Sequence, residues 1–258
     1  MATGAARPLA LRPMGVGEVI DAGFGLARHN FRLLVQISAW AVVPGFVVSS
    51  AVSLAFPIGL STLPMGIAQA VAGIAIAFAC GAILDPDLFP SGVRPTVLYR
   101  AVLGRLPSLL AISILITILV VPLLVILPLG IFIGIRWSMV LNAVILDRRG
   151  PLSGLRESWQ VTRGAFWHTF GVLVVSGLLY MVFSYIVAGV FGGFSLLLLF
   201  VAKSATAVGI VSNLASGVTA LLITPFTTAI NVVLFFELKS RSQGFDLVLR
   251  ARQLRSSG

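Results

Sequence analysis

Long apolar runs alternate with short polar segments along the whole chain. A helix needs about 20 apolar residues to cross roughly 30 Å of hydrocarbon, and the runs can be divided into pieces of about that length. The predicted spans cover residues 33–56, 66–84, 107–125, 128–146, 166–187 and 214–236. Pro122 and Pro128 suit a turn between the third and fourth, and Pro225 predicts a kink in the last. We therefore expect an all-α polytopic bundle of about six transmembrane helices, forming a single integral membrane domain over residues 1–258.

The apolar segment 191–213 can be interpreted as a seventh span, a re-entrant segment or an interfacial segment. A seventh span would place the tail 237–258, with its five Lys and Arg residues, outside the cell. With six spans, sixteen of the eighteen Lys and Arg residues lie on one side, Lys203 lies on the other, and Arg136 lies within the membrane. Because cytoplasmic loops carry the excess of Lys and Arg, this distribution favours six spans with both termini and the tail in the cytoplasm.

Three segments that precede predicted spans, 12–32, 95–106 and 151–165, have apolar positions at helical spacing opposite a basic face. In the first, the apolar stripe is Val16, Ile20, Phe24, Ala27 and Phe31. In the third, it is Leu152, Leu155, Trp159 and Phe166. This pattern is typical of helices that lie in the membrane interface on the cytoplasmic side. The arginines expected to contact lipid there, anionic lipid in particular, are Arg28, Arg32, Arg105, Arg156 and Arg163.

Superposing Arg28, Arg105 and Arg163 aligns three similar entries into a span. The chain then reads as a threefold internal repeat of one interfacial helix and two spans. Repeats of this kind often frame a site in membrane proteins. The alternative is that any cytoplasmic loop entering a span tends to be amphipathic and basic, which would produce the same likeness without a repeat.

Composition supports the membrane interpretation and removes other classes. The chain is 58% hydrophobic and 10% charged, with a mean hydropathy of +1.07. A soluble chain of 258 residues could not cover so much apolar surface. The net charge of +10 does not indicate nucleic-acid binding, because the basic residues flank apolar runs. Sixteen Arg against two Lys, with abundant Ala and Gly, favours a GC-rich bacterial source, and hence the bacterial cytoplasmic membrane.

Arg136 is the most suggestive candidate for function, because it lies in the middle of the fourth predicted span. A charge there is costly unless it is paired or hydrated. Its candidate partners are backbone carbonyls, water, Asn142, Asn213 and Asn231, with Glu237 as the nearest plausible counter-charge. One interpretation is an anion or lipid-headgroup contact in a wet cavity. The other is a structural arginine that closes a helix-packing network or extends to the interface.

Catalytic and metal-binding patterns are weak in this sequence. Cys80 is the one cysteine, which excludes an internal disulfide and a cysteine-rich metal site. His29 and His168 lack the nearby Cys or carboxylate residues of a zinc site, and are interpreted as interfacial polar anchors. The sequence contains no GxSxG, HExxH or P-loop pattern. We therefore expect no catalytic residue, no metal and no cofactor.

Three motifs, taken together and in order, resemble a family of integral membrane domains. They are RPMGVGEVIDAGFGLARHNFRLL (Arg12–Leu34), the segment from Arg136 through Asp147 and Gly150 to LRESWQVTRGAFW (Leu155–Trp167), and FFELKSRSQGFDLVL (Phe235–Leu249). The family is named after the membrane domain of glycerophosphoryl diester phosphodiesterases and includes relatives of unknown function.

The chain departs from the family pattern at a few positions. Asp147 and Glu237 stand where the family tends to Glu and Asp, and Asn142 and Gln243 stand where proline and an acidic residue are expected. The resemblance implies that hydrolysis, in members that perform it, belongs to a separate soluble domain, which we expect to be missing here. We therefore predict a non-enzymatic scaffold or accessory protein, with membrane lipids and an unidentified protein as partners. The alternative is a transporter or lipid-handling protein with Arg136 in a central cavity.

Overall fold

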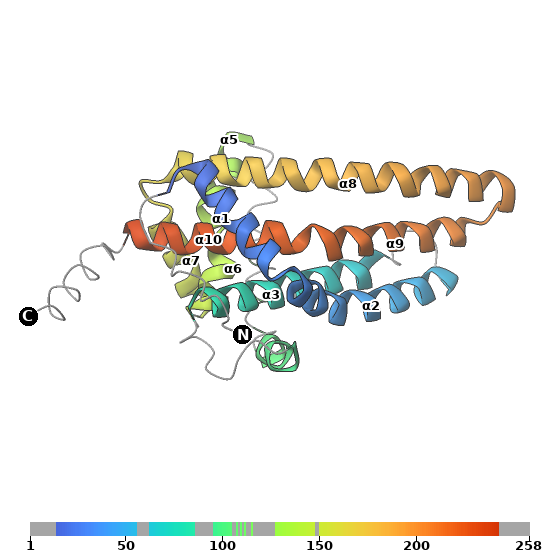
Figure 1. Cartoon of the computed structure of the whole chain (residues 1–258), viewed down its shortest axis with the longest axis horizontal. Helices are drawn as coiled ribbons and strands as arrows, with labels where there is room; N and C mark the ends of the chain where they lie inside the picture. Colours follow the sequence, from blue (N-terminus) through green and yellow to red (C-terminus); the bar gives the residue numbers. More distant parts are fainter. Residues whose placement is uncertain are drawn as a thin grey trace, which may run out of the picture.

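A computed structural model describes residues 14–55, 62–85, 95–104, 127–147 and 150–242, together with residues 107, 109, 111 and 115. None of these residues forms a β-strand, which confirms the predicted all-α fold. The helices are α1 (Val16–His29), α2 (Phe31–Ala55), α3 (Thr62–Leu84), α5 (Leu127–Trp137), α6 (Val140–Leu146), α7 (Pro151–Val161), α8 (Phe166–Ala202), α9 (Ala205–Leu222) and α10 (Thr224–Ser242). Residues 95–104 are also helical. Figure 1 shows the longest helices running roughly along one common axis.

Helix α8 is the longest element and determines the length of the molecule (Figure 1). Its 37 residues rise about 55 Å at 1.5 Å per residue, well beyond the roughly 30 Å of hydrocarbon in a bilayer. The chain then reverses at Lys203, whose φ of 46° is left-handed, and Ser204, whose hydroxyl accepts the N–H of Ala207 at 3.2 Å. The segment 191–213 is therefore the tip of a helical hairpin. The predicted fifth span, 166–187, is only part of this helix, which continues to Ala202. Ser195, the one polar residue between Val187 and Lys203, donates to the carbonyl of Phe191 and does not interrupt the helix.

The return arm of this hairpin consists of two helices joined at a bend. Residues Thr206–Leu222 and Thr224–Ser242 meet at 42°, with Ile223 between them. Pro225 lies in the first turn of α10, where its missing N–H costs no internal hydrogen bond. The kink predicted at Pro225 is therefore present. Helix α8 packs against both helices of the return arm, α9 and α10.

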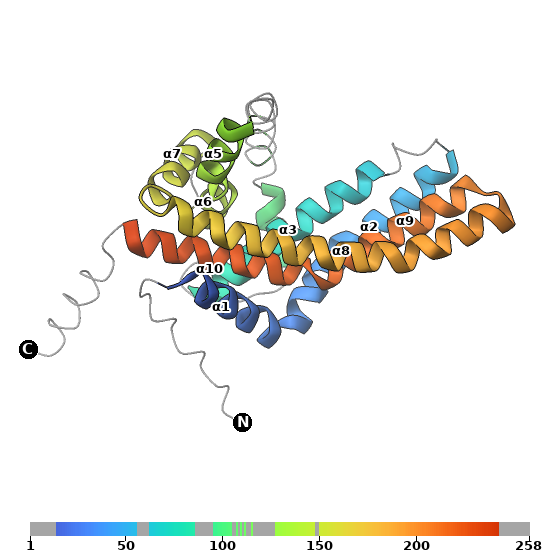
Figure 2. The same cartoon turned by 90° about the horizontal axis from the view of Figure 1, so that it is seen from above.

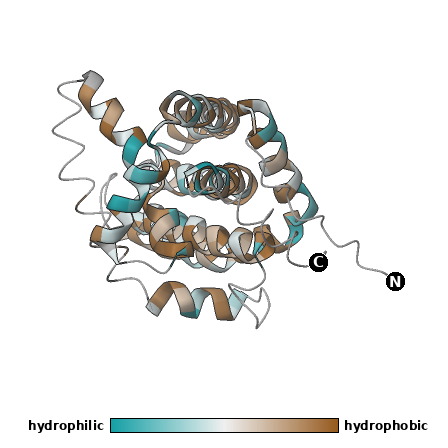
Figure 3. Cartoon of the chain, turned by 90° about the vertical axis from the view of Figure 1, so that its left-hand side faces the viewer, coloured by the Kyte–Doolittle hydropathy of each residue, from teal (hydrophilic) through white to brown (hydrophobic). Residues whose placement is uncertain are grey.

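Helices α2 and α3 form a second hairpin that packs on α9 and α10. The short helices gather near the other end of the molecule. Figure 2 shows α1 on one side of α10 and the group α5, α6 and α7 on the opposite side. Seen from that end in Figure 3, hydrophilic and hydrophobic positions alternate along the short helices. The largest buried cluster joins α1, α3, α6 and α10 there.

The approach of α1 to α10 depends on a glycine. A Cβ atom at Gly23 would stand 2.6 Å from the Cα of Ile230, so no other residue fits without moving one helix. Val19, Gly23 and Ala27 are the buried ridge of α1. Phe24, which belongs to the predicted apolar stripe, is instead 36% exposed. The face of α1 that packs against α10 is thus lined mainly by small residues, because close backbone contact favours small residues over large ones.

In α7 the predicted stripe is also turned away from the protein. Leu152 is 75% exposed and Trp159 is 39% exposed, whereas Glu157, Ser158 and Val161 are buried. Gly150 precedes the helix and Pro151 lies in its first turn, where its missing N–H costs no internal hydrogen bond. An outward apolar stripe is what a helix in contact with lipid requires. The helices expected at 12–32, 95–106 and 151–165 are present as α1, residues 95–104 and α7.

Four described helices are long and apolar enough to cross a membrane, and the bent pair α9–α10 makes up to five. They include Leu129–Leu146, which is interrupted at Ser138 and Met139. Most of the predicted span 107–125 lies outside the described residues. A count of six spans and the threefold repeat therefore remain predictions. The first and third units do share one design, in which a short helix (α1 or α7) leads into a long hairpin.

Candidate functional site

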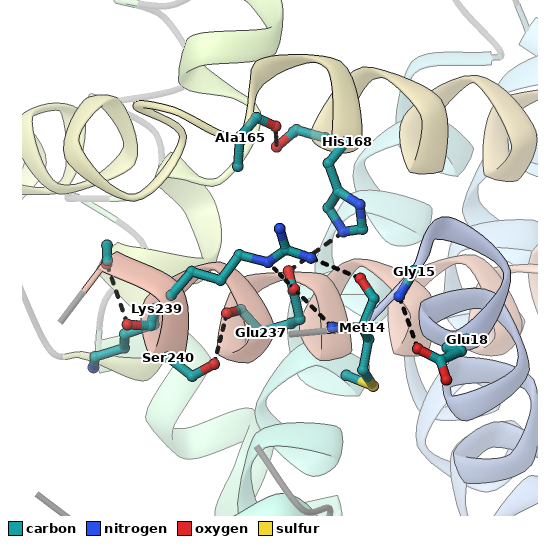
Figure 4. Close-up of polar contacts among 11 residues, drawn as sticks. Met14, Gly15, Glu18, Ala165, His168, Glu237, Lys239 and Ser240 are labelled. Atoms are coloured by element: carbon teal, nitrogen blue, oxygen red, sulfur yellow. Dashed lines mark hydrogen bonds and ion pairs between the residues drawn. The ribbon is translucent and has the colours of Figure 1, made fainter. Parts of the chain in front are cut away.

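Three places in the structure are candidates for a functional site: a buried polar cluster, an arginine among aromatic rings, and an apolar groove. We call the first the polar joint, and define it as Met14, His168, Glu237 and Arg241. Its elements are the start of α1, the first turn of α8 and the last turns of α10 (Figure 4).

Glu237 is the centre of the polar joint and its side chain has no exposed surface. Its Oε1 accepts the backbone N–H of Met14 at 3.2 Å and the Nε–H of Arg241. The Nη2 of Arg241 donates in turn to the carbonyl oxygen of Met14 at 2.7 Å. The Nε2 of His168 lies 3.4 Å from Oε2 of Glu237. A buried carboxylate is tolerated only when such partners replace its water.

A second ion pair lies beside the joint and ties α10 to the end of α6. The Nζ of Lys239 stands 2.5 Å from Oδ1 of Asp147, and both side chains are mostly buried. At the start of α1, the N–H of Gly15 donates to Oε2 of Glu18 at 2.8 Å, as in a capping box. These contacts draw segments from both halves of the sequence into one rigid end of the molecule.

The three asparagines expected around Arg136 have other partners. The Nδ2 of Asn142 in α6 donates to the carbonyl of Asn231 in α10 at 3.3 Å, and Nδ2 of Asn231 donates to Thr227 at 2.9 Å. The Nδ2 of Asn213 in α9 donates to Oγ of Ser53 in α2 at 3.3 Å. Asn142 and Asn213 thus join helices by hydrogen bonds. The structure does not bring these residues and Glu237 together around the guanidinium of Arg136.

Arg136 instead lies among three aromatic rings from three helices, an arrangement we call the arginine box. Its guanidinium carbon is 5.2 Å from the ring centres of Phe132 (α5) and Trp159 (α7), and 6.0 Å from that of Phe166 (α8). It stands near the middle of Leu129–Leu146, as predicted, but at the end of α5, where the helix is interrupted. Its carbonyl accepts the hydroxyl of Ser158 at 2.7 Å, which replaces the lost helical hydrogen bond.

The apolar groove, which we call the α8 groove, has a volume of about 630 Å³. One wall is a stripe of α8 that includes Leu179 and Val182, and the other is formed by Phe24 of α1, Phe31 of α2 and the residues around the α9–α10 bend. The rings of Phe24 and Phe31 lie 5.0 and 5.7 Å from that of Phe226, which fixes the inner end of the groove.

The arginines predicted to contact lipid are exposed at every such position that the structure describes. Arg28, Arg32, Arg156 and Arg163 are all exposed, and Arg105 lies outside the described residues. Among the described residues, no three His, Cys, Asp or Glu side chains are grouped closely enough to hold a metal ion.

Sequence reasoning assigned the wrong environment to His168. It was interpreted as an interfacial anchor, but its side chain is 13% exposed and it faces Glu237. The arginine box was also missed. Part of it is visible in the sequence, since Phe132 precedes Arg136 by one helical turn, and Trp159 and Phe166 lie on either side of the break between α7 and α8. The periodicity of apolar residues does not show, however, that these helices meet.

Comparison with known proteins gives one match. Residues 108–255 match the family described as the membrane domain of glycerophosphoryl diester phosphodiesterase. The match covers α5 to α10, and so includes the arginine box and the α10 side of the polar joint. Neither the curated proteins nor the solved structures that were compared contain a match to the chain.

Proposed function

The chain belongs to this family of membrane domains, and we propose that it acts as a non-enzymatic accessory protein or scaffold within the membrane. Its multi-pass membrane character follows from the family and from its long apolar helices. The observation that carries the proposal is how its polar residues are used. Glu237, Asn142 and Asn213 hold helices together, while the arginines of α1 and α7 remain exposed. This is the design of a rigid body that presents a basic surface.

Bacterial cytoplasmic membrane is the proposed location, with both termini in the cytoplasm. Two observations support this orientation. The contact between Met14 and Glu237 brings the first and last described segments to the same end. Lys203 lies at the opposite end, at the α8–α9 turn (Figure 1). With the basic residues concentrated at the end that holds the polar joint, the positive-inside rule places that end in the cytoplasm.

The proposed partners are anionic membrane lipids and a protein that docks on the basic end, with no nucleic acid. Each basic residue near an anionic surface contributes about 1 kcal/mol to attraction. The test is lipid analysis of the chain extracted in native nanodiscs, with wild type beside Arg28→Gln/Arg32→Gln. We expect less anionic lipid around the variant. Equal lipid composition in both would contradict the proposed role of Arg28 and Arg32.

Catalysis needs a separate test, because the matched family is named after a phosphodiesterase. The purified chain would be incubated with a glycerophosphodiester, with and without Mg²⁺ or Ca²⁺, and released glycerol phosphate measured. We expect no release above that of a protein-free control. Release that scales with the amount of chain would overturn the non-enzymatic assignment.

A second candidate function, lipid handling, is favoured by the α8 groove. Its apolar walls and its volume of about 630 Å³ suit an acyl chain, and it lies beside the bend in the return arm. Broken helices in membrane transporters often border a binding site. The test is lipid exchange between vesicles containing the reconstituted chain. Exchange above that of empty vesicles would support this function, and its absence would leave the scaffold as the better account.

A further inference from the structure

The guanidinium of Arg136 is incompletely satisfied. Its Nε and Nη1 atoms are buried, and within the described part of the chain neither has a hydrogen-bond acceptor. Aromatic faces attract the positive charge, at about 0.5–2 kcal/mol per contact, but they provide no lone pair for an N–H group. A buried donor without an acceptor costs about 1–3 kcal/mol, and more when charged. The arginine box therefore holds a charged donor prepared for an acceptor that the neighbouring helices do not supply.

Neighbouring positions indicate the charge of that acceptor. Trp159, which covers one side of the guanidinium, lies between Arg156 and Arg163 in sequence, three residues after one and four before the other. The spacing places Arg156 and Trp159 on one face of α7, Arg163 follows in the turn between α7 and α8, and all three are exposed. The described carboxylates nearest in sequence do not accept hydrogen bonds from Nε or Nη1 of Arg136. Asp147 pairs with Lys239. Glu157 has other interactions and is buried on the opposite side of α7. The surroundings favour an anion.

The aromatic residues indicate where in the membrane the anion lies. Phe132 and Trp159 are partly exposed, and the adjoining Trp167 is 77% exposed. Phe166 packs edge-on against Trp167 at 5.4 Å between ring centres. Exposed Trp residues of a membrane protein concentrate at the level of the lipid headgroups. Although Arg136 lies near the middle of the apolar stretch Leu129–Leu146, its neighbour Phe166 is the first residue of α8, so the arginine box lies at the end of α8 opposite Lys203. An anion at that depth, beside an apolar surface, is the phosphate of a phospholipid.

We propose that Arg136, assisted by Arg156 and Arg163, binds the phosphate of a membrane phospholipid. Guanidinium and phosphate form charge-assisted hydrogen bonds, and Nε and Nη1 of Arg136 are the donors that lack a partner among the described residues. The rings of Phe132, Trp159 and Phe166 hold the guanidinium in place and contact the upper part of the acyl chains. This site deepens the lipid-contact part of the proposed function and rests on it, but it is one defined position, whereas Arg28 and Arg32 act as part of a general basic surface.

The experiment is native mass spectrometry of the full chain in a neutral detergent, titrated with phosphatidylglycerol. A galactosyl diacylglycerol, which has the same tails and no phosphate, is the control lipid. We expect one phosphatidylglycerol to bind in preference to the galactolipid, and Arg136→Gln to weaken it about tenfold or more, the range for a charge-assisted hydrogen bond. Lys203→Gln, at the exposed basic residue of the α8–α9 turn at the opposite end of the molecule, should leave this binding unchanged.

Two results would overturn the site: equal binding of both lipids by wild type, or unchanged phosphatidylglycerol binding by Arg136→Gln. Displacement by millimolar inorganic phosphate would identify the free ion, not a lipid, as the ligand, and so contradict the lipid assignment. If Arg136→Gln does not fold, Arg156→Gln/Arg163→Gln decides, since both side chains are exposed: weaker binding supports the site and unchanged binding contradicts it. Failure of the general proposal is separate, because it is read from Arg28→Gln/Arg32→Gln in nanodiscs.

Discussion

Glu237 accepts a hydrogen bond from the backbone N–H of Met14, 223 residues earlier in the chain, at 3.2 Å. This contact joins the first and last described segments of the chain, because it holds the start of α1 against the last turns of α10. Arg241 completes the fastening by bonding to Glu237 and to the Met14 carbonyl at the same time. The rigidity of the basic end thus depends on one buried carboxylate.

Replacing Glu237 with Leu should destabilise the protein severely. The change leaves the Met14 amide and the Arg241 guanidinium without their acceptor, and breaking a buried ion pair costs about 3–5 kcal/mol. Thermal unfolding in detergent measures the effect, with Asp21→Asn on the exposed face of α1 as the control. A melting temperature close to that of the control would show that the polar joint does not hold the ends together.

The joint also predicts energetic coupling between its side chains. Arg241→Met alone should be costly, but the double variant Glu237→Leu/Arg241→Met should cost less than the sum of the two single changes, because it removes the unpaired charge. The coupling is expected at about 1–3 kcal/mol for residues in one network. Simple additivity in a double-mutant cycle would argue against a shared network.

Gly23→Val should separate α1 from α10. Its side chain would occupy the space of the Ile230 backbone, so the helices must move apart, at a cost of about 1–3 kcal/mol for overpacking. Gly17→Val is the matched control, since it lies on the same helix with no neighbouring atom within 4 Å of the added Cβ. Limited proteolysis and thermal unfolding should both affect the Gly23 variant more strongly, and equal effects would contradict the close approach.

Single-cysteine labelling tests the orientation. In a Cys80→Ala background, Lys203→Cys should react with a membrane-impermeant maleimide in intact bacterial cells, and Ser242→Cys should react only after the membrane is opened. This follows from placing the polar joint in the cytoplasm and the α8–α9 turn on the other side. The reverse pattern would invert the topology, and labelling of both in intact cells would contradict a membrane crossing by α9–α10 between the two positions.

Filling the α8 groove should exclude an acyl chain without unfolding the protein. Val182→Trp adds a large side chain within the groove, and Val190→Trp makes the same change farther along α8, at a position 70% exposed and outside the groove. The Val182 variant should copurify with less bound lipid than the Val190 variant. Equal amounts of lipid would indicate that the groove is simply part of the lipid-facing surface.

The positions of the helices were largely predictable, because apolar runs of membrane length and amphipathic segments are local properties of the sequence. The helix ends were less so. The one polar residue from Phe191 to Ala202, Ser195, donates to the carbonyl of Phe191 in the same helix, and two adjacent glycines did not break α8, since glycine is tolerated where helices lie in lipid. Conversely, the helix is interrupted at Ser138 and Met139, and neither residue is a proline or glycine that would have predicted the break.

The contacts of the candidate residues could not be predicted, because they depend on how distant helices are turned and shifted against one another. The sequence singles out Arg136 as a charge within an apolar run, but its aromatic neighbours come from α5, α7 and α8 and could not be predicted. Glu237 was assigned to Arg136 as the nearest counter-charge, and instead pairs with Arg241 one turn later on its own helix. That local pairing was visible as an i, i+4 spacing in the sequence.

The most direct test of the accessory role is mass spectrometry of the chain extracted in native nanodiscs, with wild type beside Arg136→Leu. The account predicts a protein partner at a fixed ratio to the chain, retained in the variant, because the exposed faces of α1 and α7 carry that contact. Loss of a bound phospholipid in the variant is compatible with this result. A chain that brings no protein partner, and that carries a small molecule other than a phospholipid which is lost in Arg136→Leu, would contradict the accessory role and favour a transporter.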